Sequence, residues 1–387
     1  MCKTANGTRR LLLLFSDTGG GHRSTAYAVA QTLRDLYGER AQVELVDALA
    51  EYAPWPFNRP SDVYPQMLRL KGLVWRAGFH LSDGPRRVRL PAMGWELLTS
   101  AAMRRLLRDH PADLVVSCHA AFNHLLLRLL PKVDGNTPLV TLVTDLTAAH
   151  AFWFAPGVAR CLVPTEGTRQ DALIRGLSAE RVLETGLPVR PCFAQVMREN
   201  AVAVRRRLGL RTDLPVVLIV SGAEGMGSSY HLYKAIANSG VRAQLVVIAG
   251  RNKRLRGKLT AEEWPLPVRV EGFVQNMHEW MRSADLLVTR ASPTIISEAM
   301  VVGLPMVLSG ALPGHERPNV DYVTQSGAGL WTPKPGQVAA AVRELLTPGN
   351  PDLAQMAARA RALARPDAAR HVADILWSIA GGNWPEG

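Results

Sequence analysis

The strongest constraint on the fold of this 387-residue chain is a series of short apolar runs separated by helix-length amphipathic segments. In the first half the runs are LLLLF at 11–15, QVELVDA at 42–48, DLVVSC at 113–118, PLVTLVTD at 138–145 and RCLVPT at 160–165. Strands buried on both faces read as continuous apolar runs. Their alternation with helices therefore predicts a parallel α/β sheet.

The same pattern restarts near residue 214, which predicts a second α/β domain. Its runs are PVVLIVSG at 215–222, AQLVVIAG at 243–250, RVEGF at 269–273, DLLVTR at 285–290 and PMVLSG at 305–310. The segment GLPVRPCF at 186–193 contains two prolines and a glycine, which disfavour a helix or a central strand, so we expect the linker there. The expected domains are 1–187 and 188–365, with a C-terminal helix in 366–387 that packs back on the first domain.

Cysteine spacing, hydropathy and charge narrow the class of protein. The four cysteines have no CxxC or Cys/His ligand spacing, so we expect neither a disulfide framework nor a metal site. No stretch approaches the length of a spanning helix, and the N-terminal segment does not resemble a signal peptide, so we expect a cytoplasmic protein. A net charge of +12 predicts an anionic partner, either nucleic acid or a lipid surface.

The segment 52–110 differs in composition from both predicted domains. It contains ten arginines and lysines against four acidic residues, interleaved with three tryptophans and two phenylalanines. Indole rings prefer the headgroup layer of a bilayer and arginines attract anionic lipid, so the segment predicts a membrane-docking surface. A solvated basic face with aromatic residues in the core is the alternative. Stacking on nucleic-acid bases is a third reading, but no nucleic-acid motif accompanies the composition.

Two glycine-rich loops follow predicted strands. SDTGGGH at 16–22 and GAEGMGSS at 222–229 each stand where a strand turns into a helix, where backbone N–H groups can meet an anion. A tight turn with a surface histidine is the alternative for the first loop. Two such loops would face one another across a cleft, which is where ligands commonly bind.

Acidic and amide residues follow the later strands of the second domain. In TRASPTIISEAMVVGLP at 289–305, Glu298 could complement a helix dipole or bind the hydroxyls of a ribose. In LPGHERPNVDY at 312–322, Gly314, His315, Glu316 and Asn319 form a polar cluster suited to phosphates or hydroxyls. An ordinary loop before a capped helix is the alternative.

Taken in order, these motifs resemble the monogalactosyldiacylglycerol synthase family and its processive diacylglycerol glucosyltransferase relatives. The resemblance runs from about residue 11 to residue 330. It is carried by FSDTGGGHRSTA (15–26), VTDLTAAHAFWF (143–154), VPTE (163–166), GLPVRP (186–191), GAEGMG (222–227), VVIAGRNKRLRGKL (246–259), GFVQNMHEWMRSADLLVTRASPTIISEAM (272–300), GLPMVLSGALPGHERPNV (303–320) and SGAG (326–329).

The resemblance implies the GT-B fold, in which two Rossmann-like domains face one another across a cleft. The family shares this fold with the lipid-linked N-acetylglucosamine transferase of peptidoglycan synthesis. The implied activity is a hexosyltransferase that moves galactose or glucose, with inversion, from a UDP-sugar to diacylglycerol. The reaction would occur at the cytoplasmic face of a membrane on a peripheral enzyme.

By the same resemblance the C-terminal domain holds the UDP-sugar, with Glu298 on the ribose and Phe273 and Val274 near the uracil. The other matching donor positions are Gly225, Met226, Gly227, Gly250, Arg251, Ser292, Pro293, Thr294, His315, Glu316 and Asn319. The chain has ASPTI where the family usually has AGPGT, and PGHE where it usually has PGQE. His315 therefore replaces a glutamine expected to face the sugar, which leaves the identity of the hexose open.

Inversion needs a base for the attacking hydroxyl, and His22 is the first candidate because a neutral imidazole titrates near working pH. Asp145 is the rival base, or it orients the histidine. Helix N-termini and loop amides would stabilise the leaving UDP, so neither a metal nor another cofactor is expected. The residues expected on the acceptor and membrane side are Gly20, Gly21, Trp55, Trp75, Arg86, Arg87, Arg89, His150 and Trp153.

The expected partners are a UDP-hexose, diacylglycerol and an anionic membrane surface, without nucleic acid. The alternative acceptors are a polyprenyl-linked or an already glycosylated lipid. A non-enzymatic protein that binds nucleotide or nucleic acid is the competing function.

Overall fold

The computed structural model describes residues 7–17, 20–59, 89–222, 230–312, 314 and 316–382, with side chains of the helix at 89–109 described from Met93 onward. The chain forms two compact units. Unit 1 comprises residues 1–190, 313–315 and 367–387, and unit 2 comprises residues 191–312 and 316–366. The first crossing, between Arg190 and Pro191, falls inside the proline-containing segment 186–193.

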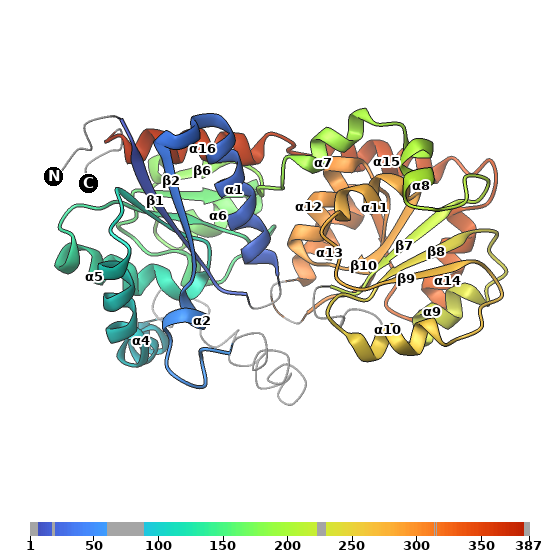
Figure 1. Ribbon diagram of the computed structural model, residues 1–387, viewed down its shortest axis with the longest axis horizontal. Helices are drawn as coiled ribbons and strands as arrows, with labels where there is room; N and C mark the ends of the chain where they lie inside the picture. The colour runs from blue at the N-terminus through green and yellow to red at the C-terminus, as the bar shows by residue number, and fades with distance from the viewer. Residues whose placement is uncertain are drawn as a thin grey trace. The chain divides into compact units, whose positions relative to one another are not determined.

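Unit 1 contains a six-stranded parallel sheet in the order β2-β1-β3-β4-β5-β6 (Figure 1). Its strands are β1 (Arg9–Phe15), β2 (Ala41–Asp47), β3 (Leu114–Ser117), β4 (Leu139–Leu142), β5 (Arg160–Val163) and β6 (Val182–Glu184). Its helices of five or more residues are α1 (Gly21–Tyr37), α2 (Ala48–Tyr52), α4 (Arg89–Asp109), α5 (Asn123–Val133), α6 (Glu166–Ile174) and α16 (Ala368–Ala380).

Both faces of the unit 1 sheet are covered, because side chains of its interior strands alternate between two apolar cores. Along β1, Leu12 and Leu14 enter a core shared with α4 and α5, while Leu11, Leu13 and Phe15 enter a core shared with α1 and α16. This arrangement explains the uninterrupted LLLLF run.

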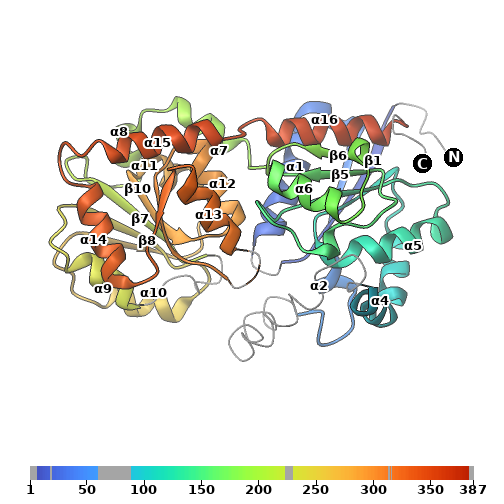
Figure 2. The same cartoon turned by 180° about the vertical axis from the view of Figure 1, so that it is seen from behind.

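The C-terminal helix α16 completes the second of these cores. Val372, Leu376 and Ile379 are buried in it, and Trp377 stacks on Tyr37 of α1 with ring centroids 4.1 Å apart. The Arg9 guanidinium lies over the same indole. Figure 2 shows α16 beside α1 from the opposite side to Figure 1.

Unit 2 contains a second six-stranded parallel sheet in the order β12-β11-β10-β7-β8-β9. Its strands are β7 (Val216–Val220), β8 (Gln244–Ile248), β9 (Val268–Glu271), β10 (Leu286–Arg290), β11 (Met306–Gly310) and β12 (Gly329–Trp331). Its helices are α7 (Cys192–Gln195), α8 (Ala201–Arg207), α9 (Tyr230–Ala237), α10 (Lys253–Thr260), α11 (Met277–Ser283), α12 (Pro293–Val302), α13 (Arg317–Gln325), α14 (Pro335–Leu345) and α15 (Asp352–Leu363).

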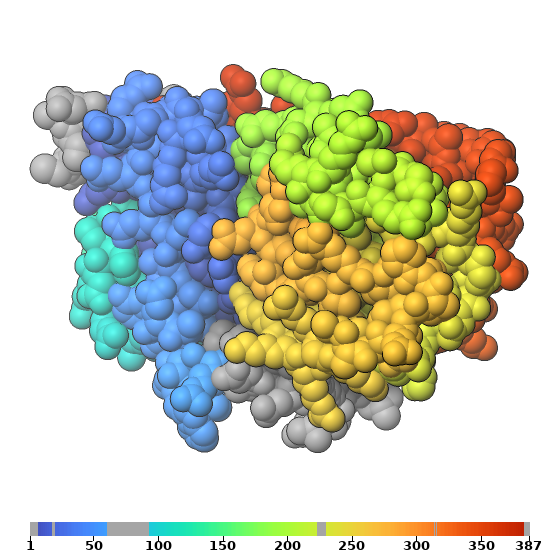
Figure 3. Space-filling view, turned by 45° about the vertical axis from the view of Figure 1, so that its right-hand side comes forward, coloured from blue at the N-terminus to red at the C-terminus, as the bar shows by residue number. Residues whose placement is uncertain are grey.

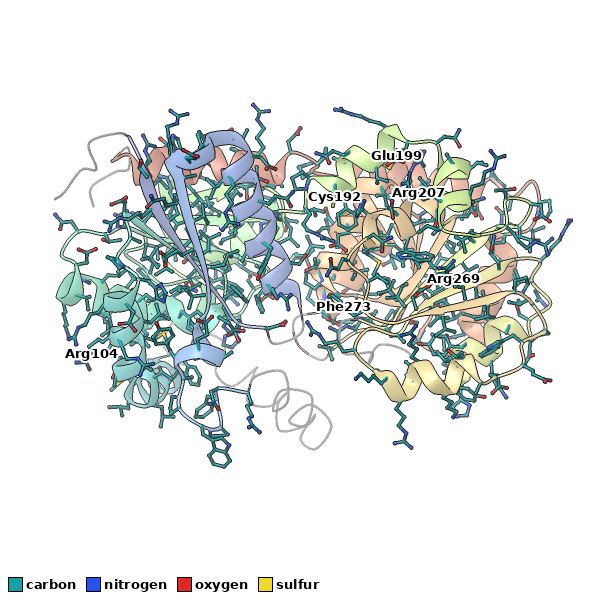
Figure 4. All side chains as sticks on the ribbon, viewed as in Figure 1. Arg104, Cys192, Glu199, Arg207, Arg269 and Phe273 are labelled. Atoms are coloured by element: carbon teal, nitrogen blue, oxygen red, sulfur yellow. The ribbon has the colours of Figure 1, made fainter. Side chains whose placement is uncertain are left out.

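Arg207 joins two of the unit 2 helices at the surface. Its guanidinium forms ion pairs of 2.7 Å with Glu199, which precedes α8, and with Glu279 of α11. Figure 3 shows the yellow-green α8 region lying against the orange α11 region, and Figure 4 labels Glu199 and Arg207 as neighbours. The first helices of unit 2 are thereby held to the helix that precedes β10.

All ten apolar runs predicted as strands are strands in the structure, and the predicted pair of parallel sheets is confirmed. The prediction missed β6 and β12, which are three-residue strands at the edges of the two sheets. Only Val182 of β6 and Gly329 of β12 are buried, so neither strand produces a continuous apolar run. A three-residue strand is too short to show a hydrophobic pattern from which a strand can be predicted.

Candidate active site

The carboxyl ends of β1, β3 and β4 bring together a group of polar and aromatic side chains. In a parallel sheet these ends share one edge, where ligands bind in folds of this kind. After β1 the chain turns at Gly20, whose φ of 87° is in the left-handed region that favours glycine, and α1 then begins at Gly21. His22 is consequently in the first turn of α1.

His22 is surrounded by residues from three other segments. Its Nδ1 lies 2.7 Å from the Thr144 Oγ1 after β4, and its ring meets His119 after β3 edge to face with centroids 4.5 Å apart. The Trp153 ring, from the 3₁₀ turn Ala151–Trp153, lies 5.9 Å away. His22, His119, Thr144, Trp153 and Asp145 are referred to below as the His22 cluster.

Asp145 enters the cluster through Trp153. The indole Nε1–H of Trp153 donates to Asp145 Oδ2 at 2.7 Å, and Trp153 itself is buried. The Asn123 side chain donates to the Trp153 carbonyl at 3.2 Å, which fixes the turn that carries the indole. Asp145 therefore bonds to the indole that lies beside His22, while its neighbour Thr144 forms a hydrogen bond with the histidine ring.

His150 lies outside this cluster and begins the turn that carries Trp153. Its Nδ1 accepts the Phe152 N–H at 3.2 Å, and its ring stacks on Phe152 with centroids 5.3 Å apart. These contacts cap the turn and bury the side chain. The expected contact of His150 with an acceptor stays a prediction.

Sequence reasoning missed His119 and Thr144. His119 directly follows the predicted strand DLVVSC at 113–118, and Thr144 lies at the end of PLVTLVTD at 138–145. Their position at the carboxyl ends of strands next to β1 was the available signal, because those ends lie at one edge of the sheet. Spacing along the chain could not show that both touch one imidazole.

His119 is held in its neutral form. The Ala121 N–H donates to its Nδ1 at 3.2 Å, which requires that nitrogen to be unprotonated. Burial lowers the pKa of His119 well below its usual value, and the neighbouring His22 lowers it further. Burial also raises the pKa of the adjacent Cys118 thiol to about 12, so it remains protonated.

In unit 2 the described residues expected to bind the donor lie after β8, β9, β10 and β11. Gly250, with a φ of 62°, turns the chain after β8, and Asn252 caps α10 by accepting the Leu255 N–H at 2.9 Å. The Arg251 guanidinium lies over the Phe273 ring after β9, 4.9 Å from its centroid. Phe273 is half exposed and is labelled in Figure 4 beyond the end of β9. Val274 follows it in the same loop.

The N-terminus of α12 follows β10 and lies in the segment expected to meet the diphosphate. Ser292 is its N-cap residue and makes no side-chain capping bond, and Pro293 occupies the first turn. The backbone N–H groups of Thr294 and its successor therefore lie at a helix end suited to a phosphate. Glu298, one turn further on, is buried.

Glu316 and Asn319 support this helix end from within. Glu316, 1% exposed, accepts the Leu312 N–H at 2.7 Å and pairs with Arg290 at 3.4 Å. The Asn319 amide donates to the Ala291 carbonyl at 3.0 Å. The Asn319 bond joins α13 to the loop between β10 and α12, and the Glu316 bonds join the start of α13 to the end of β10 and to the loop after β11. Whether they also touch a sugar or phosphate remains a prediction.

Several expected site residues lie outside the described part of the chain. They are Gly225, Met226, Gly227, His315, Trp75, Arg86 and Arg87. Arg89 is described only as the first residue of α4. Trp55 lies in the loop after α2 and is 78% exposed. No group of three or more potential metal ligands occurs among the described residues.

Two family models match this chain. The first, Monogalactosyldiacylglycerol (MGDG) synthase, matches residues 22–189, and the second, the Glycosyltransferase family 28 C-terminal domain, matches residues 228–372. Monogalactosyldiacylglycerol synthase 2, chloroplastic, of Arabidopsis thaliana is 35% identical over 97% of this chain and 81% of its own length. The chain belongs to the monogalactosyldiacylglycerol synthase family. A probable monogalactosyldiacylglycerol synthase of Glycine max is 36% identical over 93% of the chain and 69% of its own length.

Solved structures show that this family member has the predicted GT-B fold. MurG of Acinetobacter baumannii has a TM-score of 0.57 and 17% identity, over 95% of this chain and 99% of its own. The calicheamicin glycosyltransferase CalG4 has a TM-score of 0.59 and 16% identity, over 98% and 100%. Anabaena HepE, solved in complex with UDP-glucose, has a TM-score of 0.57 and 15% identity, over 96% and 100%.

The predicted family and the predicted enzyme class are therefore confirmed, and the protein is a glycosyltransferase. Family membership favours this function over a non-enzymatic binding protein. Within the described residues, no helix is long and apolar enough to cross a bilayer.

We expect His119 to make the folded protein less stable as the pH falls. Its pKa in the folded protein is below that in an unfolded chain, so between these two values the unfolded state binds one proton more. The free energy of unfolding should fall below about pH 6.5, by at most about 1.4 kcal/mol per pH unit for this proton. Urea denaturation near pH 7 and near pH 5 measures the change.

The matched variant is His119→Asn, whose side-chain oxygen can accept the Ala121 N–H but does not titrate. It should lose less stability than the wild type over the same pH interval. An equal loss in both proteins would show that His119 contributes nothing to the pH dependence.

Proposed function

We propose that this enzyme transfers galactose from UDP-galactose to the free hydroxyl of diacylglycerol, with inversion at the anomeric carbon. The His22 cluster carries this proposal, because it places a histidine among polar and aromatic groups at the carboxyl edge of the unit 1 sheet. The choice of galactose is supported by the names of the relatives, which are monogalactosyldiacylglycerol synthases.

His22 is the proposed general base. The acceptor oxygen attacks the anomeric carbon while its proton passes to Nε2, because Nδ1 is the nitrogen that pairs with Thr144. The bond between that carbon and the diphosphate oxygen breaks, and UDP leaves. Asp145 and Trp153 shape the acceptor side of the base through their 2.7 Å hydrogen bond.

Unit 2 is proposed to hold UDP-galactose. The N-terminus of α12 would receive the diphosphate, Glu298 the ribose hydroxyls, and the Phe273 and Val274 loop the uracil. The likeness of the fold to HepE, which was solved with UDP-glucose, supports a UDP-sugar as donor. Helix and loop N–H groups then stabilise the leaving diphosphate, so we propose that no divalent metal is required.

The substrate proposal is tested by incubating the purified chain with radiolabelled UDP-galactose and diacylglycerol vesicles, followed by thin-layer separation of the lipids. We expect a single-galactose lipid, formed equally in the presence of EDTA. UDP-glucose as the better donor would overturn the choice of sugar. Product formed only on a polyprenyl-linked or glycosylated lipid would overturn the choice of acceptor.

Replacing the base should abolish most turnover without weakening the donor site. We expect His22→Ala to lower kcat at least about 100-fold, because general base catalysis contributes roughly 10²–10⁴-fold. UDP affinity, measured by calorimetry, should stay near that of the wild type because His22 is in unit 1. Wild-type turnover in this variant would remove His22 from the mechanism.

We also propose that unit 1 docks on an anionic bilayer at the cytoplasmic face of the membrane, and α4 offers the contact surface. Its outer face begins with exposed Met93, Leu97 and Leu98, and Leu97 is 84% exposed. Exposed Arg104 and Arg108 continue the same face toward the end of the helix, and Arg104 is labelled on α4 in Figure 4. An apolar strip followed by arginines suits the boundary between acyl chains and anionic headgroups.

The apolar part of this face is tested by Leu97→Ser combined with Leu98→Ser. We expect binding to phosphatidylcholine vesicles containing phosphatidylglycerol to weaken about tenfold or more, because two exposed leucines no longer enter the interface. Arg104→Glu with Arg108→Glu should weaken it similarly and reduce its dependence on salt. Vesicle co-sedimentation measures both effects.

Ile174→Ser provides the matched control, since Ile174 is 75% exposed on α6 of the same unit. This change should leave vesicle binding as in the wild type. Binding that resists salt, or that falls equally with Ile174→Ser, would contradict docking through α4.

A further inference from the structure

Thr144 has a single role in the described structure, which is its contact with His22. The residue follows β4, its side chain is buried, and its hydroxyl lies 2.7 Å from His22 Nδ1. A buried hydroxyl without a hydrogen bond costs free energy, so this contact accounts for the presence of a polar side chain there. Thr141 lies three residues earlier, in β4, and its hydroxyl instead donates to the Asn123 side chain at 3.1 Å.

A neutral imidazole carries its proton on one nitrogen only, and a base needs its lone pair on the nitrogen that faces the substrate. With Nδ1 next to Thr144, the nitrogen that receives the substrate proton is Nε2. His22 can therefore act as a base only in the form that has hydrogen on Nδ1. The Thr144 oxygen is placed to accept that hydrogen.

We propose that Thr144 is a positioning residue that holds His22 in the Nδ1–H tautomer. This inference rests on the proposed role of His22 as the base. When Nε2 takes up the substrate proton, Nδ1 still donates to Thr144, so the pair keeps its geometry through the reaction. The bond becomes charge-assisted in that state, and hence stronger.

Three titratable groups in the segments around the ring have hydrogen-bond partners of their own. His119 after β3 meets the ring edge to face, and its Nδ1 is used by the Ala121 N–H. Asp145 accepts from the Trp153 indole, and Asp17 accepts from Arg23 at 3.1 Å. The hydroxyl is a neutral acceptor, so it orients the ring without pairing it with a carboxylate.

The test uses wild-type protein with ¹⁵N-labelled histidine, and long-range ¹H–¹⁵N spectra at a pH where histidine is neutral. The His22 signals are assigned by their loss in His22→Ala. We expect the Nδ1–H pattern for His22 in the wild type and in Thr144→Ser, and the Nε2–H pattern or a mixture in Thr144→Val. An Nε2–H pattern in the wild type would overturn the inference, whether or not His22 proves to be the base.

Turnover provides the second readout. Thr144→Val should lower kcat roughly 10- to 100-fold with little change in the KM for UDP-galactose, and Thr144→Ser should restore most of it. Wild-type kcat in Thr144→Val would overturn the inference. Retained activity in His22→Ala would instead count against the proposed base, and the spectra would still decide the tautomer.

Thr32→Val is the matched control for loss of a buried hydroxyl. Thr32 is buried on α1, the helix that carries His22, and its hydroxyl donates to the Ala28 carbonyl at 2.8 Å. This variant should keep the wild-type spectrum and turnover. If it changed the His22 tautomer as much as Thr144→Val does, the effect would come from general loosening of unit 1, and the specific role of Thr144 would be refuted.

Discussion

The burial of β1 on both faces is the constraint on which unit 1 depends. Its leucines alternate between two cores, which fixes the register and direction of the strand. The same strand pairs in parallel with β2 and β3, so their carboxyl ends come to one edge. His22 lies where it does because α1 begins immediately beyond that edge, after a turn that needs glycine at residue 20.

The sequence predicted the structure best where several apolar residues followed one another. Every interior strand could be predicted, because burial on both faces leaves at least three consecutive buried residues in each, most of them apolar. The edge strands β6 and β12 are partly exposed and only three residues long, so they carry no such pattern. Motifs that follow predicted strands singled out His22, Asp145 and Glu298, because glycines and strand ends mark the loops of a parallel sheet.

Side-chain partners could not be predicted in the same way. Asp145 was expected beside the histidine as a base or an orienting carboxylate, and the structure joins it to the Trp153 indole. Thr144 and His119 were missed, because contact with one ring depends on side-chain direction at the ends of separate strands. The buried bonds from the Leu312 N–H to Glu316 and from Asn319 to the Ala291 carbonyl depend equally on three-dimensional packing.

The return of α16 to unit 1 has a consequence for the order in which the protein folds during synthesis. Leu376 and its apolar neighbours fill a core whose other walls include β1 and α1, which are synthesised before unit 2. Until α16 emerges from the ribosome, that face of α1 and of the sheet has no cover from this helix, while unit 2 has already been made. Unit 1 is therefore begun before unit 2 but completed after it, and the nascent chain must remain soluble with this apolar face open.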